Sequence, residues 1–531
     1  MSVSPTAEKN ATAKIRWFAM PYLHGRGLDV GCGPEKVLPR AIGVGLPINF
    51  SRSAATDASS NGTSLDLFAT SALDYVFSSH YLDCLQDWQA ALADWWRVLR
   101  PGGCLVLYLL HARLSGDSEG TSAPSPGGRG FLPATVLGAM RRVMHDSGGE
   151  VLEDEERDEG DEESFFQVYR KREDGLYIYR PWRRHPHSCL VIRWGGYGDA
   201  LMASSLLPSL KAEGWYVAFN ADTKCEEILR HNPHIDELIV TPSVPMEGLG
   251  NYWKALGSRY DRVINLSETC EGILLKTPSQ ADYYWSDDVR RRICAANYVE
   301  FQHLVAGVRY ELRQRFYATE SERAWAREVI GEHPTVLWAL AGSAQHKIWP
   351  WMGAAIVRLL GLRPDVRILL TGGSGTREKE LEQTLFDRVA RYFGHAGERF
   401  RSFVGKCSIR RSMALAQEAT VVVGPETGVL HAVALEGNAK VVLLSHSTAL
   451  NLTRDWINAV SVEPDTARAP CWPCHRLHHG TAHCPQIGGA AACAVSIDVE
   501  RVLEPVLQAL DSARAHDTAL EATLNGALSF S

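Results

Sequence analysis

Short apolar runs, each followed by a glycine-rich or polar turn and a helical stretch, recur along most of the chain. Within residues 25–110, strands are expected at residues 27–30, 73–77 and 104–110, and a helix is expected over residues 88–99. Apolar runs of this length that end at turn residues are typical of buried strands. Because strands that alternate with helices form parallel sheets, the pattern predicts a doubly wound α/β domain.

The same alternation predicts two further α/β units downstream. Strands of the first are expected at residues 189–193, 215–219 and 262–266, and strands of the second at residues 335–340, 366–370, 419–424 and 440–444. A helix over about residues 498–513 is expected to close the chain, and no internal repeat stands out. Two Rossmann-like halves around a cleft form the arrangement called GT-B. The expected fold class is therefore α/β, with an N-terminal Rossmann-like domain followed by a GT-B fold.

Segments of polar and charged composition separate these units. Residues 115–129 are rich in Ser, Gly and Pro, which is typical of a mobile loop. The acidic run at residues 150–163 is expected to be a solvated surface segment and not a binding element. The expected parts are an N-terminal domain at residues 1–171, a polar linker at residues 172–187, a first GT-B half at residues 188–318 and a second at residues 319–531.

At 531 residues the chain exceeds the size of one hydrophobic core, which favours three domains. A hydrophobic content of 45% with 22% charged residues is ordinary for a globular protein, and the net charge of −7 gives no reason to expect nucleic acid. The first residues lack the apolar core of a signal peptide, and no apolar run approaches the ~20 residues of a membrane span. We expect a cytoplasmic protein, whose 12 cysteines are reduced thiols or metal ligands and not a disulfide framework.

Two glycine-containing turns, far apart in the sequence, carry the strongest chemical signal. The first is Gly-Gly-Tyr-Gly-Asp, which follows an apolar strand and ends at Asp199, and the second is Gly-Pro-Glu-Thr-Gly at residues 424–428. Glycine lets the backbone approach a ligand closely, and free N–H groups at a helix start attract phosphate. The pair predicts an enzyme that holds a nucleotide diphosphate in one half and presents a base from the other.

Residues 188–510 resemble the ADP-heptose heptosyltransferases of glycosyltransferase family nine. The resemblance rests on the turn that ends at Asp199, on the segment Ala-Gly-Ser-Ala-Gln-His-Lys-Ile-Trp-Pro at residues 341–350, and on the turn at residues 424–431. It implies transfer of a sugar from a nucleotide diphosphate to a hydroxyl group. That reaction needs a base for the acceptor hydroxyl and positive charge for the leaving diphosphate.

The resemblance implies two catalytic residues. It makes Asp199 the base, although an aspartate at this place is also a good N-cap for the helix that follows. It makes Lys347 a ligand of the departing phosphate, although a lysine in a loop is more often a solvated surface residue.

The same resemblance implies the rest of the nucleotide-sugar site. Thr427 and Gly428 would donate hydrogen bonds to the diphosphate, and His431 would either assist them or make a hydrogen bond in the core. The family usually has aspartate where this chain has Glu426, so the role of Glu426 stays open. The expected binding residues also include Gly196, Gly198, Ser343, Gly372 and Gly373.

Four cysteines form a pattern that is typical of a metal site. Cys471 and Cys474 are spaced as C-x2-C, and Cys484 and Cys493 follow within a loop at residues 471–493 that is also rich in histidine. Four thiolates satisfy a tetrahedral metal ion. The cluster resembles the cysteine finger of the bacterial autotransporter heptosyltransferases, which implies iron, and zinc fits the same ligands. Disulfides formed on oxidation and free thiols are the alternatives. A structural role is expected, because the cluster offers no open coordination position.

Residues 25–110 resemble class I S-adenosylmethionine-dependent methyltransferases. The sequence Leu-Asp-Val-Gly-Cys-Gly at residues 28–33 matches their first motif, and residues 74–80 and 97–103 match a later strand and turn. Gly45 stands where an acidic residue would normally bind the ribose, so a retained fold with reduced activity is the alternative to cofactor binding. The residues implied to border S-adenosylmethionine are Asp29, Gly31, Gly33 and Ser78.

Together these features predict a bacterial inverting glycosyltransferase. It would move a heptose-like sugar from an ADP-heptose-like donor to a glycan, such as lipopolysaccharide, or to a protein hydroxyl, and methylation of the same glycan would be a second activity. Contact with the inner membrane is expected to be peripheral at most, and the chain is expected to be able to form oligomers. The alternatives are a non-catalytic scaffold that binds a glycan or a partner, and a methyltransferase beside an inactive GT-B domain.

Overall fold

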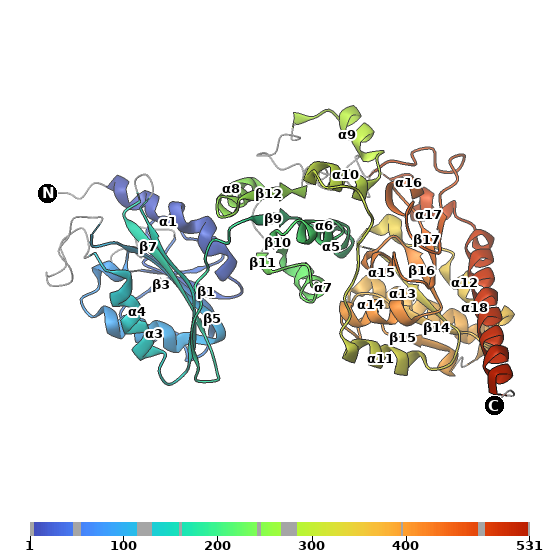
Figure 1. The fold of residues 1–531 in the computed structure, drawn as a ribbon, viewed down its shortest axis with the longest axis horizontal. Helices are drawn as coiled ribbons and strands as arrows, with labels where there is room; N and C mark the ends of the chain where they lie inside the picture. The colour runs from blue at the N-terminus through green and yellow to red at the C-terminus, as the bar shows by residue number, and fades with distance from the viewer. Residues whose placement is uncertain are drawn as a thin grey trace. The chain divides into compact units, whose positions relative to one another are not determined.

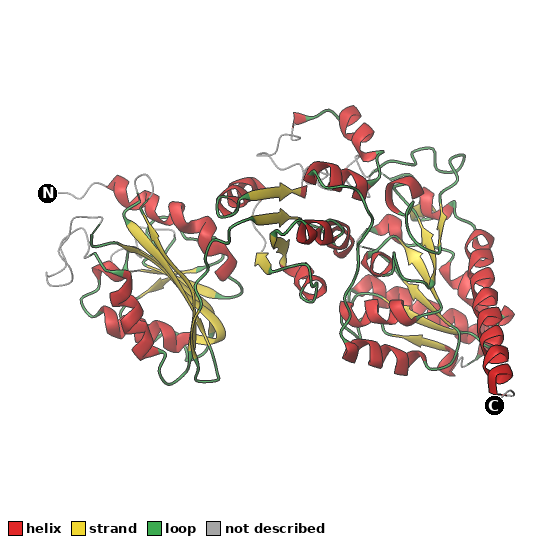
Figure 2. Cartoon of the chain, in the orientation of Figure 1, coloured by secondary structure: helices red, strands yellow, loops and turns green. Residues whose placement is uncertain are grey.

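The computed structural model describes residues 5–45, 55–113, 130–158, 162–241, 246–266, 284–342, 344–394, 397–475 and 484–528. The chain divides into two compact units (Figure 1). The N-terminal unit consists of Met1–Pro186 and Thr241–Tyr260, and the C-terminal unit consists of His187–Val240 and Asp261–Ser531. Both units combine parallel strands with helices (Figure 2), which confirms the α/β class. Across the described ranges, the helices are all too short or too polar to cross a membrane.

The N-terminal unit is built on one eight-stranded sheet with the order β3-β2-β1-β4-β5-β7-β6-β8. The first five strands in chain order pair in parallel, whereas β7 runs antiparallel to both β5 and β6. A parallel sheet with an antiparallel edge of this kind is common in doubly wound folds. The strands are β1 Gly27–Val30, β2 Ile42–Gly45, β3 Ala58–Ser59, β4 Leu73–Ser79, β5 Leu99–Leu110, β6 Gly149–Arg157, β7 Ser164–Lys171 and β8 Tyr177–Tyr179.

Helices cover the faces of this sheet. The helix expected over residues 88–99 is α3, and it begins at an N-cap, Asp87, whose carboxylate accepts the N–H of Ala90 at 3.3 Å. Its apolar stripe buries Leu92 and Trp95 against the strands, as its spacing predicts. The helices are α1 Pro5–Ala19, η1 Met20–Tyr22, η2 Leu82–Cys84, α3 Trp88–Val98, α4 Pro133–Val143 and, from the segment 241–260, α8 Met246–Gly257.

The acidic run at residues 150–163 is mostly strand β6, which corrects the expectation of a solvated segment. Glu153 has no exposed surface, and its carboxylate accepts hydrogen bonds from Arg259 at 3.1 and 2.8 Å. Burying a carboxylate is expensive unless a cation compensates it, and here that cation comes from a distant segment. The expected linker at residues 172–187 contains β8, which pairs with β6. The expected loop at residues 115–129 lies outside the described residues.

The C-terminal unit contains two parallel sheets, one in each expected GT-B half. The first has the order β11-β10-β9-β12, and β9 pairs in parallel with both β10 and β12. The second has the order β15-β14-β13-β16-β17-β18, and all its pairs are parallel. The strands are β9 Ser188–Ile192, β10 Tyr216–Asp222, β11 Glu237–Thr241, β12 Arg262–Asn265, β13 Thr335–Ala339, β14 Arg367–Thr371, β15 Phe400–Ser402, β16 Val421–Pro425, β17 Ala439–Leu443 and β18 Ala459–Val462.

Alternate residues of each buried strand face the two helical layers of the second half. In β13, Trp338 packs with the helices that bury Ile356 and Leu503, whereas Leu337 packs with those that bury Ala326 and Leu415. The helices and short strands of the unit are α5 Tyr197–Ser204, α6 Leu207–Ala212, η3 Thr223–Cys225, α7 Glu226–Leu229, α9 Asp287–Cys294, α10 Tyr298–Ala306, α11 Glu320–Ile330, η7 Gln345–Lys347, α12 Met352–Leu362, α13 Thr376–Phe393, η8 Gly397–Arg399, α14 Ile409–Glu418, α15 Gly428–Ala432, α16 Ala449–Leu452, β19 Gln486–Ile487, β20 Ala490–Ala491, α17 Ala492–Val495 and α18 Val499–Leu528.

The last helix, α18, is longer than the expected span of about residues 498–513. The extension is rich in Ala and Leu, which have high helix propensity, and it contains no proline that would end the helix.

Candidate active site

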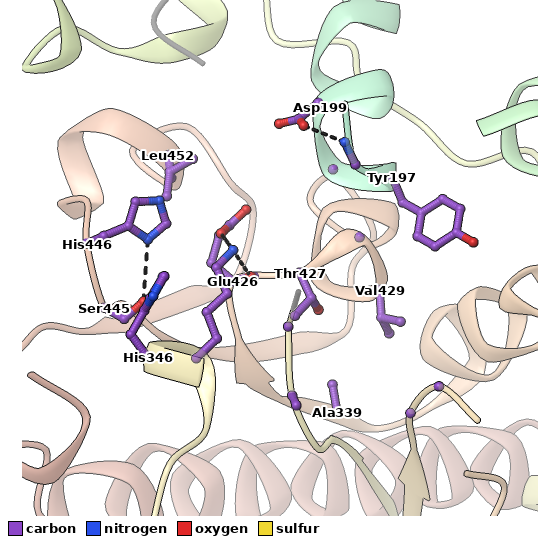
Figure 3. Close-up of a pocket in the computed structure, with 18 of the residues that line it drawn as sticks. Tyr197, Asp199, Ala339, His346, Glu426, Thr427, Val429, Ser445, His446 and Leu452 are labelled. Carbon is purple, nitrogen blue, oxygen red and sulfur yellow. Dashed lines mark hydrogen bonds and ion pairs between the residues drawn. The ribbon is translucent and has the colours of Figure 1, made fainter. Parts of the chain in front are cut away.

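A cavity of about 1080 Å³ in the C-terminal unit is lined by both of the glycine-containing turns (Figure 3). One turn leads from β9 into α5, and the other leads from β16 into α15. In both cases the site lies at the carboxyl ends of parallel strands, where α/β folds bind ligands. Most of the expected site residues of this unit line the cavity, namely Gly196, Gly198, Asp199, Lys347, Gly372, Gly373, Glu426, Thr427 and Gly428. Ser343 lies outside the described residues.

Two glycines allow the turns to touch each other. A Cβ at Gly198 would lie 2.7 Å from the ring of His431, and a Cβ at Gly428 would lie 2.5 Å from the Cβ of Tyr197. Both distances are far below ordinary carbon–carbon contact, so a side chain at either position would push the turns apart. The two distant motifs therefore converge through positions that only glycine fits.

Asp199 lies in the first turn of α5, with its carboxylate held on two sides. One oxygen accepts the N–H of Gly196 at 2.5 Å, and the other lies 3.4 Å from Nη2 of the buried Arg193. The side chain remains 28% exposed, and it lines the cavity. Since each carboxylate oxygen has two lone pairs, these contacts leave acceptor capacity for a ligand proton. Asp199 thus stabilises the start of the helix and also faces the cavity.

Lys347 is bound to Glu426 inside the cavity wall. Its ammonium donates to the main-chain oxygen of Glu426 at 2.8 Å and forms an ion pair with the carboxylate of the same residue. Glu426 also contacts Nε2 of His431 through its other oxygen at 2.6 Å. Burial alone would raise the pKa of the Glu426 carboxyl, but the charge of Lys347 and the hydrogen bond with His431 outweigh burial and hold the pKa well below its ordinary value.

Two donors on this wall are available to an anion. An ammonium group has three N–H bonds, and Glu426 takes two of those of Lys347, so one remains for a ligand. The hydroxyl of Thr427 is buried and finds no hydrogen-bond partner within the described residues. A buried hydroxyl group in the wall of a cavity can form a hydrogen bond with a ligand there.

His431 lies behind this wall and does not line the cavity. It is fully buried, and the amide of Gln314 donates to its main-chain oxygen at 3.1 Å. Of the two roles expected for His431, the structure shows the hydrogen bond in the core.

Several cavity residues were not expected from the sequence. Arg193 precedes the first turn, His346 directly precedes Lys347, and Tyr298 and His446 come from α10 and the segment after β17. A basic residue at the end of a buried strand is a local signal that could have identified Arg193. Tyr298 and His446 have no such signal, because only the tertiary fold brings them to the cavity.

The four cysteines of residues 471–493 line the same cavity. Burial raises the pKa of the Cys493 thiol to about 12, and the proximity of Cys474, Cys471 and Cys484 adds to this shift. The thiols are therefore neighbours. However, within the described ranges no three or more His, Cys, Asp or Glu side chains are arranged as ligands of one metal ion.

The expected S-adenosylmethionine residues gather at the carboxyl ends of β1 and β4. Burial raises the pKa of Asp29 to about 7, and its carboxylate accepts the N–H of Val37 at 2.6 Å. Gly33 has a positive φ of 53° and open space where a side chain would be. Gly31 is instead packed against Tyr81. Ser78 is buried and donates to the main-chain oxygen of Val30 at 3.1 Å.

The glycine turn after β1 does not lead into a helix. Residues 31–41, all of which are described, contain two prolines and run directly to β2. At β2, the N–H of Gly43 donates to the carboxylate of Asp57 at 2.8 Å, and the same carboxylate pairs with Lys36. This part of the domain thus offers a glycine-rich turn but no helix N-terminus behind it.

Comparisons with known proteins agree with both halves of the sequence interpretation. Residues 28–107 match the methyltransferase domain family, and residues 250–463 match glycosyltransferase family 9 (heptosyltransferase). No curated protein matches the chain.

Solved structures with a similar fold come from both groups. ADP-heptose lps heptosyltransferase II of E. coli is 16% identical over 62% of this chain and 99% of that chain, with a TM-score of 0.44. The iron-containing dodecameric glycosyltransferase TibC of enterotoxigenic E. coli is 13% identical over 62% of this chain and 79% of that chain, with a TM-score of 0.40. A SAM-dependent methyltransferase of Thermotoga maritima is 17% identical over 32% of this chain and 95% of that chain, with a TM-score of 0.25. The chain thus contains a segment that matches the methyltransferase domain family and a segment that matches glycosyltransferase family 9 (heptosyltransferase), and both matches support transferase activity.

Proposed function

We propose that the chain is an inverting glycosyltransferase that moves a heptose-like sugar from a nucleotide-diphosphate donor of the ADP-heptose type to a hydroxyl group. The acceptor is a glycan, such as lipopolysaccharide, or a protein side chain. The observation that carries this proposal is the convergence of Asp199 and Lys347, from opposite halves of the unit, on one cavity.

The proposed reaction is a single displacement at the anomeric carbon of the donor. Asp199 takes the proton of the acceptor hydroxyl, and the acceptor oxygen forms the new bond to the anomeric carbon. The bond between that carbon and the diphosphate oxygen breaks on the opposite face, which inverts the configuration. The free N–H of Lys347, the hydroxyl of Thr427 and the main chain at Gly428 stabilise the charge on the departing diphosphate.

Glu426 and His431 act on this reaction through Lys347. The Glu426 carboxylate fixes the ammonium in the cavity wall, and His431 fixes the carboxylate from behind. A lysine held in this way loses less conformational entropy when phosphate binds. We therefore assign Glu426 and His431 as positioning residues, and Gly196, Gly198, Gly372 and Gly373 as sites of close backbone approach to the donor.

The test is a search for donor and product with purified protein. Ligands retained on purification are identified by mass spectrometry, and a panel of nucleotide sugars that includes ADP-heptose is then assayed for nucleotide release. Wild-type protein should release ADP, and the variants Asp199→Ala and Lys347→Ala should not. Release that survives both substitutions unchanged would support the scaffold or methyltransferase alternatives.

The four cysteines suit a structural metal ion. Four thiols are a donor set for iron or zinc, and Cys471, Cys474, Cys484 and Cys493 would hold the ion, although in the described residues their side chains are not arranged around one point. When bound, the ion would stabilise the fold of the loop. The proposal assigns it no step in the transfer reaction.

The N-terminal unit is proposed to bind S-adenosylmethionine, which supplies a methyl group when bound. The open space at Gly33 and the buried carboxyl of Asp29 fit this ligand, whereas the contact between Gly31 and Tyr81 and the absence of a helix after the turn fit it less well. Calorimetry with S-adenosylmethionine decides between cofactor binding and a retained fold with reduced activity. No heat at high concentration would refute the methyltransferase assignment.

The proposal keeps the expected domain boundaries, which follow residues 171, 187 and 318. It also includes a cytoplasmic location with at most peripheral contact with the inner membrane, and the formation of oligomers.

A further inference from the structure

The cavity is larger than its nucleotide-binding part requires. Its volume of about 1080 Å³ slightly exceeds the range of about 300–1000 Å³ that is usual for a site holding one small molecule. The proposed reaction uses the wall formed by Asp199, Lys347 and Thr427. A second wall has no role in that reaction.

This second wall is lined by four ring-bearing side chains, Tyr298, His346, His446 and Trp472, here called the aromatic wall. Figure 3 shows His346 and His446 on one side of Glu426, whereas Thr427 and Val429 lie on its other side. In this view, the two histidines of the aromatic wall thus lie on the opposite side of Glu426 from Thr427.

Hydrogen bonds hold the aromatic wall in place. The hydroxyl of Tyr298 lies 3.0 Å from Oγ of Ser447 and 3.1 Å from Nδ1 of His475. The indole N–H of Trp472 donates to the main-chain oxygen of Ser447 at 3.3 Å. A Trp or Tyr whose polar atom is satisfied in this way presents its ring in a fixed orientation.

Close packing supports the same side chains. The rings of His346 and His446 pack edge to face, with their centroids 5.3 Å apart. Trp472 packs against the small buried cluster that contains Ala491, Ala492 and Cys493. The aromatic wall is therefore a preformed surface, which lowers the entropic cost of binding a ligand there.

We propose that the aromatic wall is a binding subsite for a pyranose ring. The C–H bonds on one face of a pyranose form an apolar surface that stacks on an aromatic ring, here Trp472, and the rings of Tyr298, His346 and His446 border the same cavity. This inference rests on the proposed function, because it places the ring next to the leaving group. The ring belongs either to the donor sugar or to the acceptor glycan.

The test compares wild-type protein with Trp472→Ala, with Trp472→Phe, which keeps a ring, and with the control Trp215→Ala. Trp215 stacks on His187 with ring centroids 3.7 Å apart, and it does not line the cavity. Binding of ADP and of ADP-heptose is measured by calorimetry. Binding of free monosaccharides to ADP-saturated protein is measured by saturation-transfer NMR. Circular dichroism checks the fold, and Trp472→Phe provides the answer if Trp472→Ala does not fold.

If the subsite holds the donor sugar, Trp472→Ala weakens binding of ADP-heptose by about 3- to 10-fold and leaves binding of ADP unchanged. If it holds the acceptor sugar, both nucleotide affinities stay unchanged and the monosaccharide signal is lost. In both cases Trp472→Phe retains most of the effect of the ring, and Trp215→Ala behaves as wild type.

Two results would overturn the inference while the proposed function stands. One is that Trp472→Ala weakens the binding of ADP and of ADP-heptose equally, which would mean that Trp472 contacts the nucleoside or has a purely structural role. The other is no change in any of the three measurements. Failure of the wild-type protein to bind either nucleotide would instead remove the proposed function, and the inference with it.

Discussion

Replacing Lys347 with methionine tests whether the lysine is held in a buried ion pair or lies on the surface. Methionine keeps an unbranched apolar chain of similar length but removes the charge. The side chains of Lys347 and Glu426 are 10% and 11% exposed. Lys347→Met therefore leaves a largely buried carboxylate that keeps its hydrogen bond with His431.

The expected loss of stability follows from this burial. Removing one partner of a buried ion pair costs about 3–5 kcal/mol, and the remaining hydrogen bond with His431 should reduce the cost to roughly 2–3 kcal/mol. In a domain of 150–250 residues each kcal/mol lowers the melting temperature by about 2–4 °C. We therefore expect Lys347→Met to melt roughly 4–12 °C below wild type at pH 8.

The difference should depend on pH in a defined direction. In the wild type, Lys347 and His431 outweigh burial and hold the pKa of Glu426 well below its ordinary value. The stability that this pair contributes is present above the pKa of an unfolded glutamate, about 4.3, and is lost as the pH falls through the lower pKa of the folded state. Without Lys347 the buried carboxyl takes up a proton more readily. The gap in melting temperature should therefore shrink between pH 8 and pH 5.

Thermal denaturation followed by circular dichroism measures both effects. The control is Lys406→Met, because Lys406 is 60% exposed and its contact with Glu382 at 3.3 Å is a surface ion pair worth less than about 1 kcal/mol. The double variant Lys347→Met/Glu426→Gln removes both charges and should be more stable than Lys347→Met alone. Melting of Lys347→Met within 1 °C or so of Lys406→Met at pH 8, or a gap that does not change with pH, would refute the buried-pair reasoning.

Three further outcomes are expected. Asp199→Asn should lower sugar transfer by about 10²–10⁴-fold and leave calorimetric binding of ADP unchanged, whereas activity within tenfold of wild type would exclude Asp199 as the base. Chelation or Cys474→Ser should lower the melting temperature and the metal content, and unchanged melting of a protein without metal by elemental analysis would reject the structural metal. Gly45→Asp, whose Cβ would lie 3.1 Å from Thr56, should increase the affinity for S-adenosylmethionine in calorimetry if the missing carboxylate limits binding, and an unchanged affinity would locate the limit elsewhere.

The alternation of strands and helices could be predicted from the sequence because it is a local property. Buried parallel strands are continuous apolar runs, and all of those expected in the two GT-B halves are present. Strand β6 could not be predicted, because its charged residues hide the alternation and the charge of the buried Glu153 is compensated by Arg259, from a segment far along the chain. Strand β8 is too short, and too polar in its surroundings, to stand out from a linker.

The candidate site could be predicted only where its chemistry is concentrated in one motif. The glycine turns identified Asp199 and Thr427, because glycine and a polar residue after a strand are a local signal. The ion pair of Lys347 with Glu426 was not foreseen. The role of Glu426 was left open, because its side chain is one methylene longer than the aspartate that is usual in the family. In the structure, this longer side chain contacts both the ammonium of Lys347 and His431.

Hydrogen bonds connect the cysteine segment to the residues that follow Lys347. The indole N–H groups of Trp349 and Trp351, which follow Lys347 in the sequence, donate to the main-chain oxygens of Ile497 at 2.9 Å and Val495 at 3.0 Å, just after Cys493. The turn that carries Lys347 is therefore fastened to the end of the cysteine segment. A metal ion that orders this segment would act on Lys347, the proposed phosphate ligand, without touching the substrate. For this reason Cys474→Ser should weaken ADP binding as well as lower stability, whereas Asp199→Asn, on the opposite wall, should leave ADP binding intact.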